Sequence, residues 1–586
     1  MIGRTKISAL LAATVLATAP IAAWADTLVD DVQGIRVAPD GTVERFAAML
    51  IDDAGRVKAT YRQGAKKPKD KDVDYRVEGK GRVLLPGFID SHVHLSAIGF
   101  NAMGLDLSDT TSMAEALTRI ADYAQRNPTK PWIIGRGWNE VAWNLGRLPT
   151  AAELDAAVPD RPVWLLRADG HAGWANGLAL QRAGVTAQTK APTGGRIVQA
   201  GGVPSGILID AATALVESKL PPPLPEERDI AFRKAQEMLL ARGITAVADM
   251  GTTLLDWQAV RREADVNRLH LRIASYANGV DDMVTIAGPG PSPWLYGDRL
   301  KLIGVKLWLD GALGSRGAWL TKPYADARDS TGLQLIGGTQ LRNLMSRAAM
   351  DDFQIALHAI GDAANREALD AISEMQASYP GDRRWRIEHA QVIDPADIPR
   401  FAQLGVIASM QPHHQVSDRT MAQARLSPDR LAGAYAWKSL LNSKAHLAFG
   451  SDAPVELPDV FEGIADAITR QDKAGEPFGG WQPQEIISRE QALAAYTEGG
   501  AYAVGAEGRF GTLAKGEFAD FVLVTVDPLL APPATLRQGR VLETWIAGHK
   551  VWSQSGGGLN YGAATSAATG KATSGPTGNA AAPEGR

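Results

Sequence analysis

A regular alternation of strand-like and helical segments constrains the fold of this chain more than any other feature. From Glu226 onward, short apolar runs alternate with stretches of helical periodicity. Seven runs follow Glu226, and an eighth precedes them behind the Pro86-Gly87 break. Eight β/α units are what a closed (β/α)8 barrel requires, so the sequence predicts a TIM-type barrel of the α/β class. The expected strands lie in residues 84–95, 244–250, 271–277, 302–309, 354–358, 385–389, 406–410 and 446–450.

The segments outside this alternation predict three further parts of the molecule. Short β-like runs at 26–85 and 501–552 predict a small β-sandwich module built from both ends of the chain. The barrel would occupy residues 86–500, with an insertion subdomain after its first strand at about 103–225, a segment too apolar and aromatic for a disordered loop. Residues 553–586 are rich in Gly, Ala, Ser, Thr and Pro, so we expect a disordered tail there.

The first 25 residues predict a secretory signal peptide. Arg4 and Lys6 precede an apolar run at 7–23, and Ala23-Trp24-Ala25 is typical of a cleavage site, with cleavage after Ala25. A retained membrane anchor is the alternative, but the run is short and contains Pro20. We therefore expect a periplasmic or secreted protein with no stable membrane anchor after cleavage. A net charge of -4 gives no electrostatic reason to expect nucleic acid as a partner.

The sequence contains no cysteine. This excludes disulfides, a cysteine nucleophile and a thiolate zinc site. Any bound metal must be held by nitrogen and oxygen atoms, a donor set that suits zinc, manganese, iron or cobalt.

Two histidines, His92 and His94, end the first expected strand. Alternate residues of a strand point the same way, so the two imidazoles can bind one metal ion without a change in the backbone. An isolated His-x-His pair is more often structural, so the rest of the chain must decide between the two interpretations.

Further polar residues lie near the ends of the later strands. His358 and His389 end the fifth and sixth strands, Asp452 follows the eighth, and Lys306 lies within the fourth. The active site of a barrel enzyme is formed where its strands end. The sequence therefore predicts that these residues and the first histidine pair meet at one rim of the barrel.

Strand alternation also predicts the direction of the Lys306 side chain. Ile303 and Val305 would share the face that packs on the helices, which turns Lys306 into the barrel. An unpaired ammonium group is costly there, so the pKa of Lys306 should fall and its amine should become nucleophilic. A lysine paired with Asp310 or Asp452 is an equally supported alternative.

Several motifs around these positions carry a resemblance to a known family. They are His92-Val93-His94, GVKLWLDGALGSR at 304–316, LHAIGD at 357–362, RIEHAQ at 386–391, GSDAPV at 450–455 and, in the insertion, DGHAGWAN at 169–176. They resemble the motifs of the amidohydrolase superfamily. More narrowly they resemble its YtcJ-like branch, amidohydrolase family 3, which includes N-substituted formamide deformylase. The resemblance extends from about residue 26 to residue 552.

The resemblance implies a hydrolytic site with one or two divalent metal ions, zinc being the first candidate. The histidine pair of the first strand and Asp452 would bind the more buried ion, and the histidines of the fifth and sixth strands the second. Lys306 would bridge the two ions as its CO₂ adduct. Metal-activated hydroxide would attack a carbonyl carbon, and Asp452 would carry the water's proton to the leaving nitrogen. The implied metal ligands are His92, His94, Lys306, His358, His389 and Asp452.

Four residues near the expected rim are candidate substrate contacts. Arg316 follows a Gly-rich loop and could bind a substrate carboxylate through two hydrogen bonds, although a structural ion pair is equally supported. His171 would reach the pocket from the insertion, with a satisfied loop histidine as the alternative. Trp308 could line an apolar pocket. For His413, beside His414 after the seventh strand, substrate contact and surface exposure have equal support.

These features predict a hydrolase of carbon-nitrogen bonds other than peptide bonds, acting on N-acyl, N-formyl or cyclic amides of small molecules. Hydrolysis of an ester or lactone at the same site is the alternative, because the electrophile is alike. A non-catalytic barrel that binds small molecules is poorly supported, because every ligand position is filled. Dimers are frequent in families of this kind, so a homodimer is a further expectation.

Overall fold

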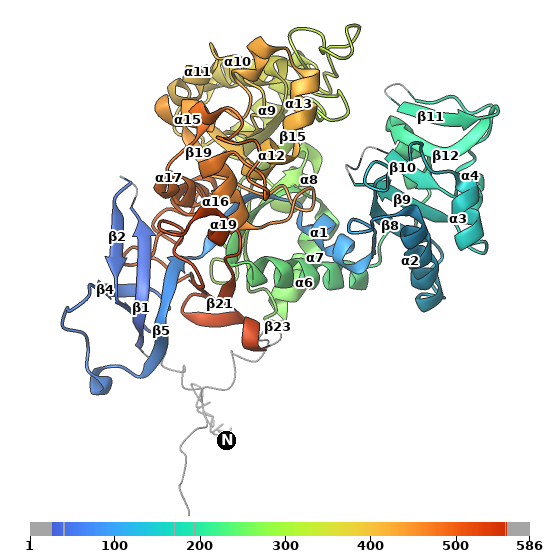
Figure 1. Ribbon diagram of the computed structural model, residues 1–586. Coiled ribbons are helices and arrows are strands. Elements are labelled where there is room, and N and C mark those ends of the chain that lie inside the picture. Colours follow the sequence, from blue (N-terminus) through green and yellow to red (C-terminus); the bar gives the residue numbers. More distant parts are fainter. Residues whose placement is uncertain are drawn as a thin grey trace, which may run out of the picture.

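A barrel of eight parallel strands forms the centre of the protein (Figure 1). The computed structural model describes residues 26–38, 41–168, 170, 172–192, 195–556 and 558–559. All eight strands predicted from the alternation are present, which confirms the (β/α)8 barrel. They are β6 (Phe88–Val93), β13 (Ile244–Thr252), β14 (Arg272–Asn278), β15 (Leu300–Trp308), β16 (Gln354–Ala359), β17 (Arg386–His389), β18 (Ile407–Met410) and β19 (His446–Phe449).

The barrel closes between its first and last strands, β6 and β19. A parallel bridge joins Val93 to Ala453, which follows β19. The His94 N–H donates to the Ala453 carbonyl oxygen (2.9 Å), and the Asp452 N–H donates to the His92 carbonyl oxygen (2.8 Å). The closure therefore holds the backbone of Asp452 beside His92 and His94.

Helices cover the barrel because its strands present alternate apolar residues to the outside. Val305 and Leu307 of β15 belong to this outer core, and Lys306 between them points inward as predicted. The helices are α6 (Pro225–Ala241), α7 (Leu254–Asp265), α8 (Val280–Ala287), α9 (Gly338–Met350), α10 (Asp362–Ser378), α11 (Ile398–Gln403), α15 (Trp437–Asn442), α16 (Val460–Thr469), α17 (Arg489–Ala495) and α18 (Glu498–Ala503).

The expectation that Ile303 shares a face with Val305 is wrong. Ile303 packs with Ala248 in a cluster separate from the outer core. The register between β14 and β15 shifts at this point, because consecutive residues of β14 pair with Leu302 and Gly304. Ile303 is thus an extra residue on β15, and such a bulge turns its side chain to the other face.

The two ends of the chain build one nine-stranded sheet beside the barrel. Its strand β5 (Tyr75–Pro86) leads across Gly87 into β6, so the sheet is tied to the first barrel strand. Apolar residues from both ends, including Phe46, Leu84 and Phe521, pack in one cluster. The other strands are β1 (Thr27–Val37), β2 (Val43–Phe46), β3 (Ala48–Ile51), β4 (Val57–Tyr61), β20 (Phe521–Val524), β21 (Val541–Ile546), β22 (His549–Ser553) and β23 (Gly558–Leu559).

An insertion between β6 and β13 forms a six-stranded sheet with its own apolar core. Figure 1 shows it on the side of the barrel away from β1 and β2. Arg136 of the insertion donates from Nη2 to the carbonyl oxygen of Pro454 (3.4 Å), two residues beyond Asp452. Its elements are β7 (Leu105–Asp106), α2 (Met113–Arg126), β8 (Ile133–Trp138), α3 (Ala151–Ala157), β9 (Val163–Arg167), β10 (Ala172–Ala175), α4 (Gly177–Ala183), β11 (Gly195–Ala200) and β12 (Val203–Asp210).

Some predictions concern residues outside the described part of the chain. The proposed signal peptide, residues 1–25, lies outside it, as does residue 171 and most of the segment predicted as a tail. Within that last segment the structure describes a helical turn at Gln554–Gly556 and strand β23. None of the described helices combines the length and apolar character needed to cross a bilayer.

Candidate metal centre

The closure of the barrel brings the first histidine pair onto one carboxylate oxygen. His92 Nε2 lies 3.4 Å and His94 Nε2 3.2 Å from Asp452 Oδ1. His92 and Asp452 are both buried. Three nitrogen and oxygen atoms thus face one point, a spacing that suits a single divalent cation.

The remaining predicted ligands lie beside this group. The ring centroids of His389 and His92 are 4.8 Å apart, and those of His389 and His358 are 4.6 Å apart. Lys306 Nζ lies 3.4 Å from His92 Nε2. The structure therefore brings together all six residues that the sequence predicts as ligands, from the ends of β6, β15, β16 and β17 and from the loop after β19.

The Nδ1 atoms of three of these histidines are engaged by neighbouring oxygen atoms. His92 Nδ1 lies 2.6 Å from Glu388 Oε2, His94 Nδ1 lies 2.6 Å from the Met250 carbonyl oxygen, and His389 Nδ1 lies 2.9 Å from Gln411 Oε1. Such contacts hold each ring in the tautomer that leaves Nε2 for a metal, as in known metal sites.

Glu388 and Arg386 support the site but were not predicted from the sequence. Arg386 Nη2 donates to Glu388 Oε2 (3.0 Å) and to the Ser409 hydroxyl (2.7 Å), and both charged residues are fully buried. Arg386 and Glu388 alternate on a short buried strand that ends in His389. The sequence signal for this pair is the presence of two opposite charges within one barrel strand. Because buried charges must be paired, these residues could have been predicted to form an ion pair inside the barrel.

Burial keeps His92, His358 and His389 neutral at pH 7. Burial and the nearby Lys306 lower the pKa of His92 to about 4 and that of His358 to about 3. Burial and the neighbouring histidines hold the pKa of His389 well below its usual value. Burial opposes ionisation of Asp452, but His92 and His94 hold its pKa well below its ordinary value. Neutral imidazoles and an ionised carboxylate are the forms that bind metals.

Lys306 is a buried amine without a salt bridge in the described part of the chain. Asp310, the partner considered in the alternative interpretation, instead accepts hydrogen bonds from the backbone N–H groups of Ile360 and Gly361 (3.0 and 2.8 Å). Burial lowers the pKa of Lys306 to about 8, against the opposing effect of Glu388. The interior position predicted from strand alternation is confirmed.

The donor atoms fit a divalent metal ion. Asp452 Oδ1 and His358 Nε2 are buried and form no hydrogen bond with any described residue, the nearest carboxylate oxygen to His358 Nε2 being Asp310 Oδ1 at 3.6 Å. Leaving such atoms unpaired costs roughly 1–3 kcal/mol each, which a bound cation would relieve. All donors are nitrogen or oxygen, so the set suits zinc, manganese, iron or cobalt.

Two of the candidate ligands have unusual backbone conformations. The φ angles of His389 and Asp452 are +74° and +59°, in the left-handed region that residues other than glycine rarely adopt. Strain of this kind, about 1–3 kcal/mol per residue, is concentrated at functional sites because it is retained only where geometry matters. Here it directs the two side chains toward the cluster.

The structure places the candidate substrate contacts in different surroundings. Arg316 forms a surface ion pair with Asp326 (2.8 Å), which favours the structural alternative over carboxylate binding. Trp308 ends β15, and its ring lies 5.7 Å from Lys306 Nζ, so it remains a candidate for lining the pocket. His171 lies outside the described residues.

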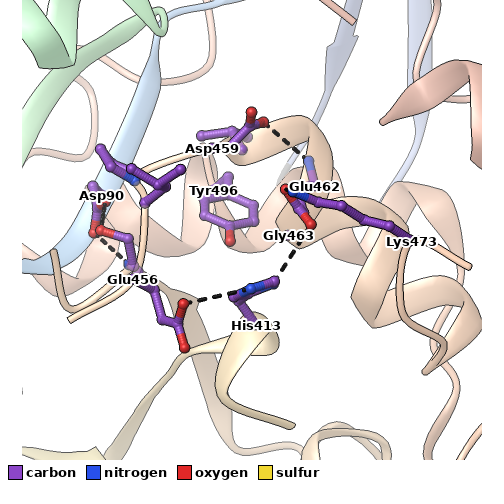
Figure 2. Close-up of a pocket in the computed structure, with 13 residues that line it drawn as sticks. Asp90, His413, Glu456, Asp459, Glu462, Gly463, Lys473 and Tyr496 are labelled. Atoms are coloured by element: carbon purple, nitrogen blue, oxygen red, sulfur yellow. Dashed lines mark hydrogen bonds and ion pairs between the residues drawn. The ribbon is translucent and has the colours of Figure 1, made fainter. Parts of the chain in front are cut away.

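His413 belongs to a separate ion-pair cluster. Figure 2 shows its ring between Glu456 and Glu462, at the edge of a cavity of about 70 Å³. His413 Nδ1 lies 2.7 Å from Asp466 Oδ2, and Nε2 lies 3.4 Å from Glu456 Oε2. Burial opposes protonation, but Asp466, Glu456 and Glu462 together raise the pKa of His413 to about 9.

The charges in this second cluster already balance. Lys473 pairs with Glu462 (3.0 Å) and Arg537 pairs with Asp466 (2.6 Å). Glu462 Oε1 accepts no hydrogen bond from the residues that the structure describes, but it lies 3.7 Å from Arg537 Nη1. Three carboxylates therefore face three cations, His413 included, so we assign this cluster to structure and not to metal binding.

The neighbouring His414 lies toward the metal centre instead. Its Nε2 is 3.8 Å from Asp452 Oδ2, and its ring stacks on that of His389 at a centroid distance of 6.1 Å. Because His413 and His414 are adjacent, the sequence could not tell which of them faces Asp452.

A (β/α)8 barrel with this cluster of histidines and one aspartate at the carboxyl ends of its strands has the architecture of a metal-dependent hydrolase. Residues 77–551 match the amidohydrolase family, and the chain belongs to that family.

Relatives and solved structures agree with this assignment. The putative amidohydrolase YtcJ of Bacillus subtilis is 32% identical over 87% of this chain and 97% of its own. Protein LONG AFTER FAR-RED 3 of Arabidopsis thaliana is 36% identical over 76% and 79%, and the N-substituted formamide deformylase of Arthrobacter pascens is 26% identical over 81% and 89%. The crystal structure of an uncharacterized metal-dependent hydrolase from Pyrococcus horikoshii is 26% identical, with a TM-score of 0.73 over 87% of this chain and 99% of that one. The chain is therefore a hydrolase of the YtcJ-like branch.

Proposed function

We propose that the protein hydrolyses carbon-nitrogen bonds of non-peptide amides, such as N-acyl, N-formyl or cyclic amides, with one or two divalent metal ions. The observation that carries this proposal is the convergence of His92 and His94 Nε2 on Asp452 Oδ1, an oxygen that forms no hydrogen bond within the described residues, with His358, His389 and Lys306 beside them.

His92, His94 and Asp452 would hold the first ion, and His358 and His389 a second. A divalent ion in this position supplies Lewis acidity, which lowers the pKa of a water molecule to about 7 and polarises a carbonyl oxygen. Glu388, through its 2.6 Å contact with His92 Nδ1, keeps the first histidine in the ligating tautomer.

Lys306 would complete the centre as its CO₂ adduct. The amine is buried beside His92 and has no salt bridge within the described residues. Conversion to a carbamate turns an unpaired cation into an anion, which two metal ions would neutralise. Without that reaction the ammonium group would lie 3.4 Å from a metal-binding nitrogen, which is electrostatically unfavourable.

Asp452 would move the proton. Its Oδ1 faces the two histidines of β6, whereas its Oδ2 faces His414. One oxygen can therefore stay with the ligands while the other takes a proton from water and gives it to the leaving nitrogen. An amide needs this transfer, because an amine anion is too poor a leaving group to depart unprotonated.

The choice of a carbon-nitrogen bond draws support from the relatives. N-substituted formamide deformylase, 26% identical over 81% of the chain, bears a name that describes removal of a formyl group from an amide nitrogen. Ester or lactone hydrolysis is the second candidate, because the same water attack and the same polarised carbonyl serve both.

The test is a substrate panel combined with elemental analysis. Purified protein is analysed for transition metals and then assayed at neutral pH with N-formyl and N-acetyl anilides, cyclic imides, aryl esters and lactones. We expect one or two metal ions per chain and the highest kcat/KM among the amides. Preference for lactones or esters would favour the second candidate, and metal-free protein that no added metal activates would contradict a metal-dependent hydrolase.

A further inference from the structure

His414 is a buried imidazole whose Nε2 has no hydrogen-bond partner among the described residues. It lies on α12 (Pro412–Ser417), directly after β18. Stacking on His389 holds the ring in place. A buried polar atom without a partner costs roughly 1–3 kcal/mol, so its presence beside a reaction centre points to a partner that arrives with the substrate.

The atom opposite His414 is the oxygen of Asp452 that would carry the proton. His414 Nε2 lies 3.8 Å from Asp452 Oδ2, too far for a direct hydrogen bond. Two groups that both hydrogen-bond to one atom lie roughly 4–5 Å apart, and the observed spacing is close to that range. A substrate atom that contacts Asp452 Oδ2 would therefore also lie within reach of His414.

We propose that His414 is a catalytic residue that binds the reacting nitrogen of the substrate and selects secondary amides, those that carry an N–H. Its Nε2 accepts a hydrogen bond from that N–H. This inference rests on the proposed amide hydrolysis and adds to it the class of amide.

The hydrogen bond orients the nitrogen for the proton transfer. The oxygen of water forms a bond to the carbonyl carbon, and its proton goes to Asp452 Oδ2. The carbon-nitrogen bond then breaks, its electron pair stays on nitrogen, and the proton moves from Oδ2 to that pair. His414 gains and loses no proton, but by holding the N–H it turns the lone pair toward Asp452. A tertiary amide has no N–H and an ester has no nitrogen, so neither can donate this hydrogen bond to His414.

The experiment compares formanilide with N-methylformanilide. We expect the metal-loaded protein to prefer formanilide in kcat/KM by at least about 100-fold, because the N-methyl compound leaves a buried acceptor unpaired. H414F, which retains a flat ring but no acceptor, should reduce the preference to about threefold or less. H414Q, whose amide oxygen can accept the N–H, should keep part of the preference. Hydrolysis of an aryl formate ester should change less than about fivefold in either variant.

Metal content and a matched control separate this role from others. H446F is also a histidine-to-phenylalanine substitution, but His446 is the first residue of β19 and Asp452 follows the opposite end of that strand. This variant should therefore leave the metal content and the preference for formanilide unchanged. Loss of a metal ion in both His414 variants would make His414 a ligand and overturn the inference. So would a formanilide preference that survives in H414F. If the wild-type protein hydrolyses esters but neither anilide, the proposed amide hydrolysis itself fails, and the inference fails with it.

Discussion

Two histidine–carboxylate clusters lie next to each other in this barrel, and adjacent residues belong to them. His413 faces Glu456 and Asp466, whose charges are balanced by neighbouring cations. His414 faces Asp452, in a cluster where Asp452 Oδ1, His358 Nε2 and His414 Nε2 have no hydrogen-bond partner in the part of the chain that the structure describes. Residue types alone would make both clusters candidate metal sites. The difference is that the protein's own cations balance the carboxylates of the second cluster, whereas no lysine or arginine of the described residues forms an ion pair with Asp452, which has only histidines around it, and function is expected there.

The largest effect should come from D452N. Asparagine can still offer an oxygen to the metal centre through Oδ1 but cannot carry a proton, so we expect kcat to fall by at least about 1000-fold. Metal content, measured by elemental analysis, should stay close to that of the wild type. Near-normal turnover of D452N would show that Asp452 does not transfer the proton. The first cluster would then not differ from the second in the chemical role of its carboxylate.

Removal of metal should destabilise the protein through the first cluster. After chelation, the buried polar atoms around Asp452 no longer have a metal ion to compensate their burial. A metal ion present at about 100 times its Kd stabilises the folded protein by about 3 kcal/mol, and chelation removes this stabilisation. We expect the melting temperature to fall by several degrees and to recover with added zinc or manganese. The same measurement on D452N should show a smaller shift. A melting temperature that does not respond to chelation would contradict the comparison.

The second cluster should respond to pH and not to metal. The pKa of His413 is raised from 6.5 to about 9, so its ion pairs stabilise the fold fully below about pH 6.5 and are lost as the pH rises through about 9. We expect H413Q to lower the free energy of unfolding by about 2 kcal/mol at pH 7, measured by urea denaturation, with the difference shrinking toward pH 10. The groups that face His413 are Glu456, Glu462 and Asp466, with Lys473 and Arg537 beside them.

H446Q is the control for that series. Burial lowers the pKa of His446, so its replacement should change the free energy of unfolding by the same amount at pH 7 and at pH 10. Equal pH profiles for H413Q and the wild type would mean that His413 is not charged in the folded protein, and the contrast with His414 would lose its electrostatic basis.

The smallest effect should come from R316Q. Arg316 lies in a partly exposed ion pair with Asp326, and such pairs contribute about 0–1 kcal/mol. We expect kcat/KM to change less than about twofold across the amide panel. A selective loss of activity toward substrates that carry a carboxylate would restore the role that the sequence suggested for this residue.

The periodic parts of the molecule could be predicted from the sequence because their signals are local. Each barrel strand is a short apolar run, and alternation within β15 is enough to turn Lys306 inward. His358, His389 and Asp452 could be placed because strand ends meet at one rim in any barrel of this kind. Ile303 could not be placed, because its direction depends on a register shift between two strands.

The sequence by itself determined the eight strands, the N/O character of the donors and the six residues that meet at the rim. Only the tertiary structure decided which polar atoms are satisfied. Glu388 contacts His92, which is 296 positions away in the sequence, and Asp326 forms an ion pair with Arg316. His413 and His414 belong to different clusters although they are adjacent in the sequence. The physical reason is that a strand's pattern is set by nearest neighbours along the chain, whereas the pairing of a buried charge is set by neighbours in space.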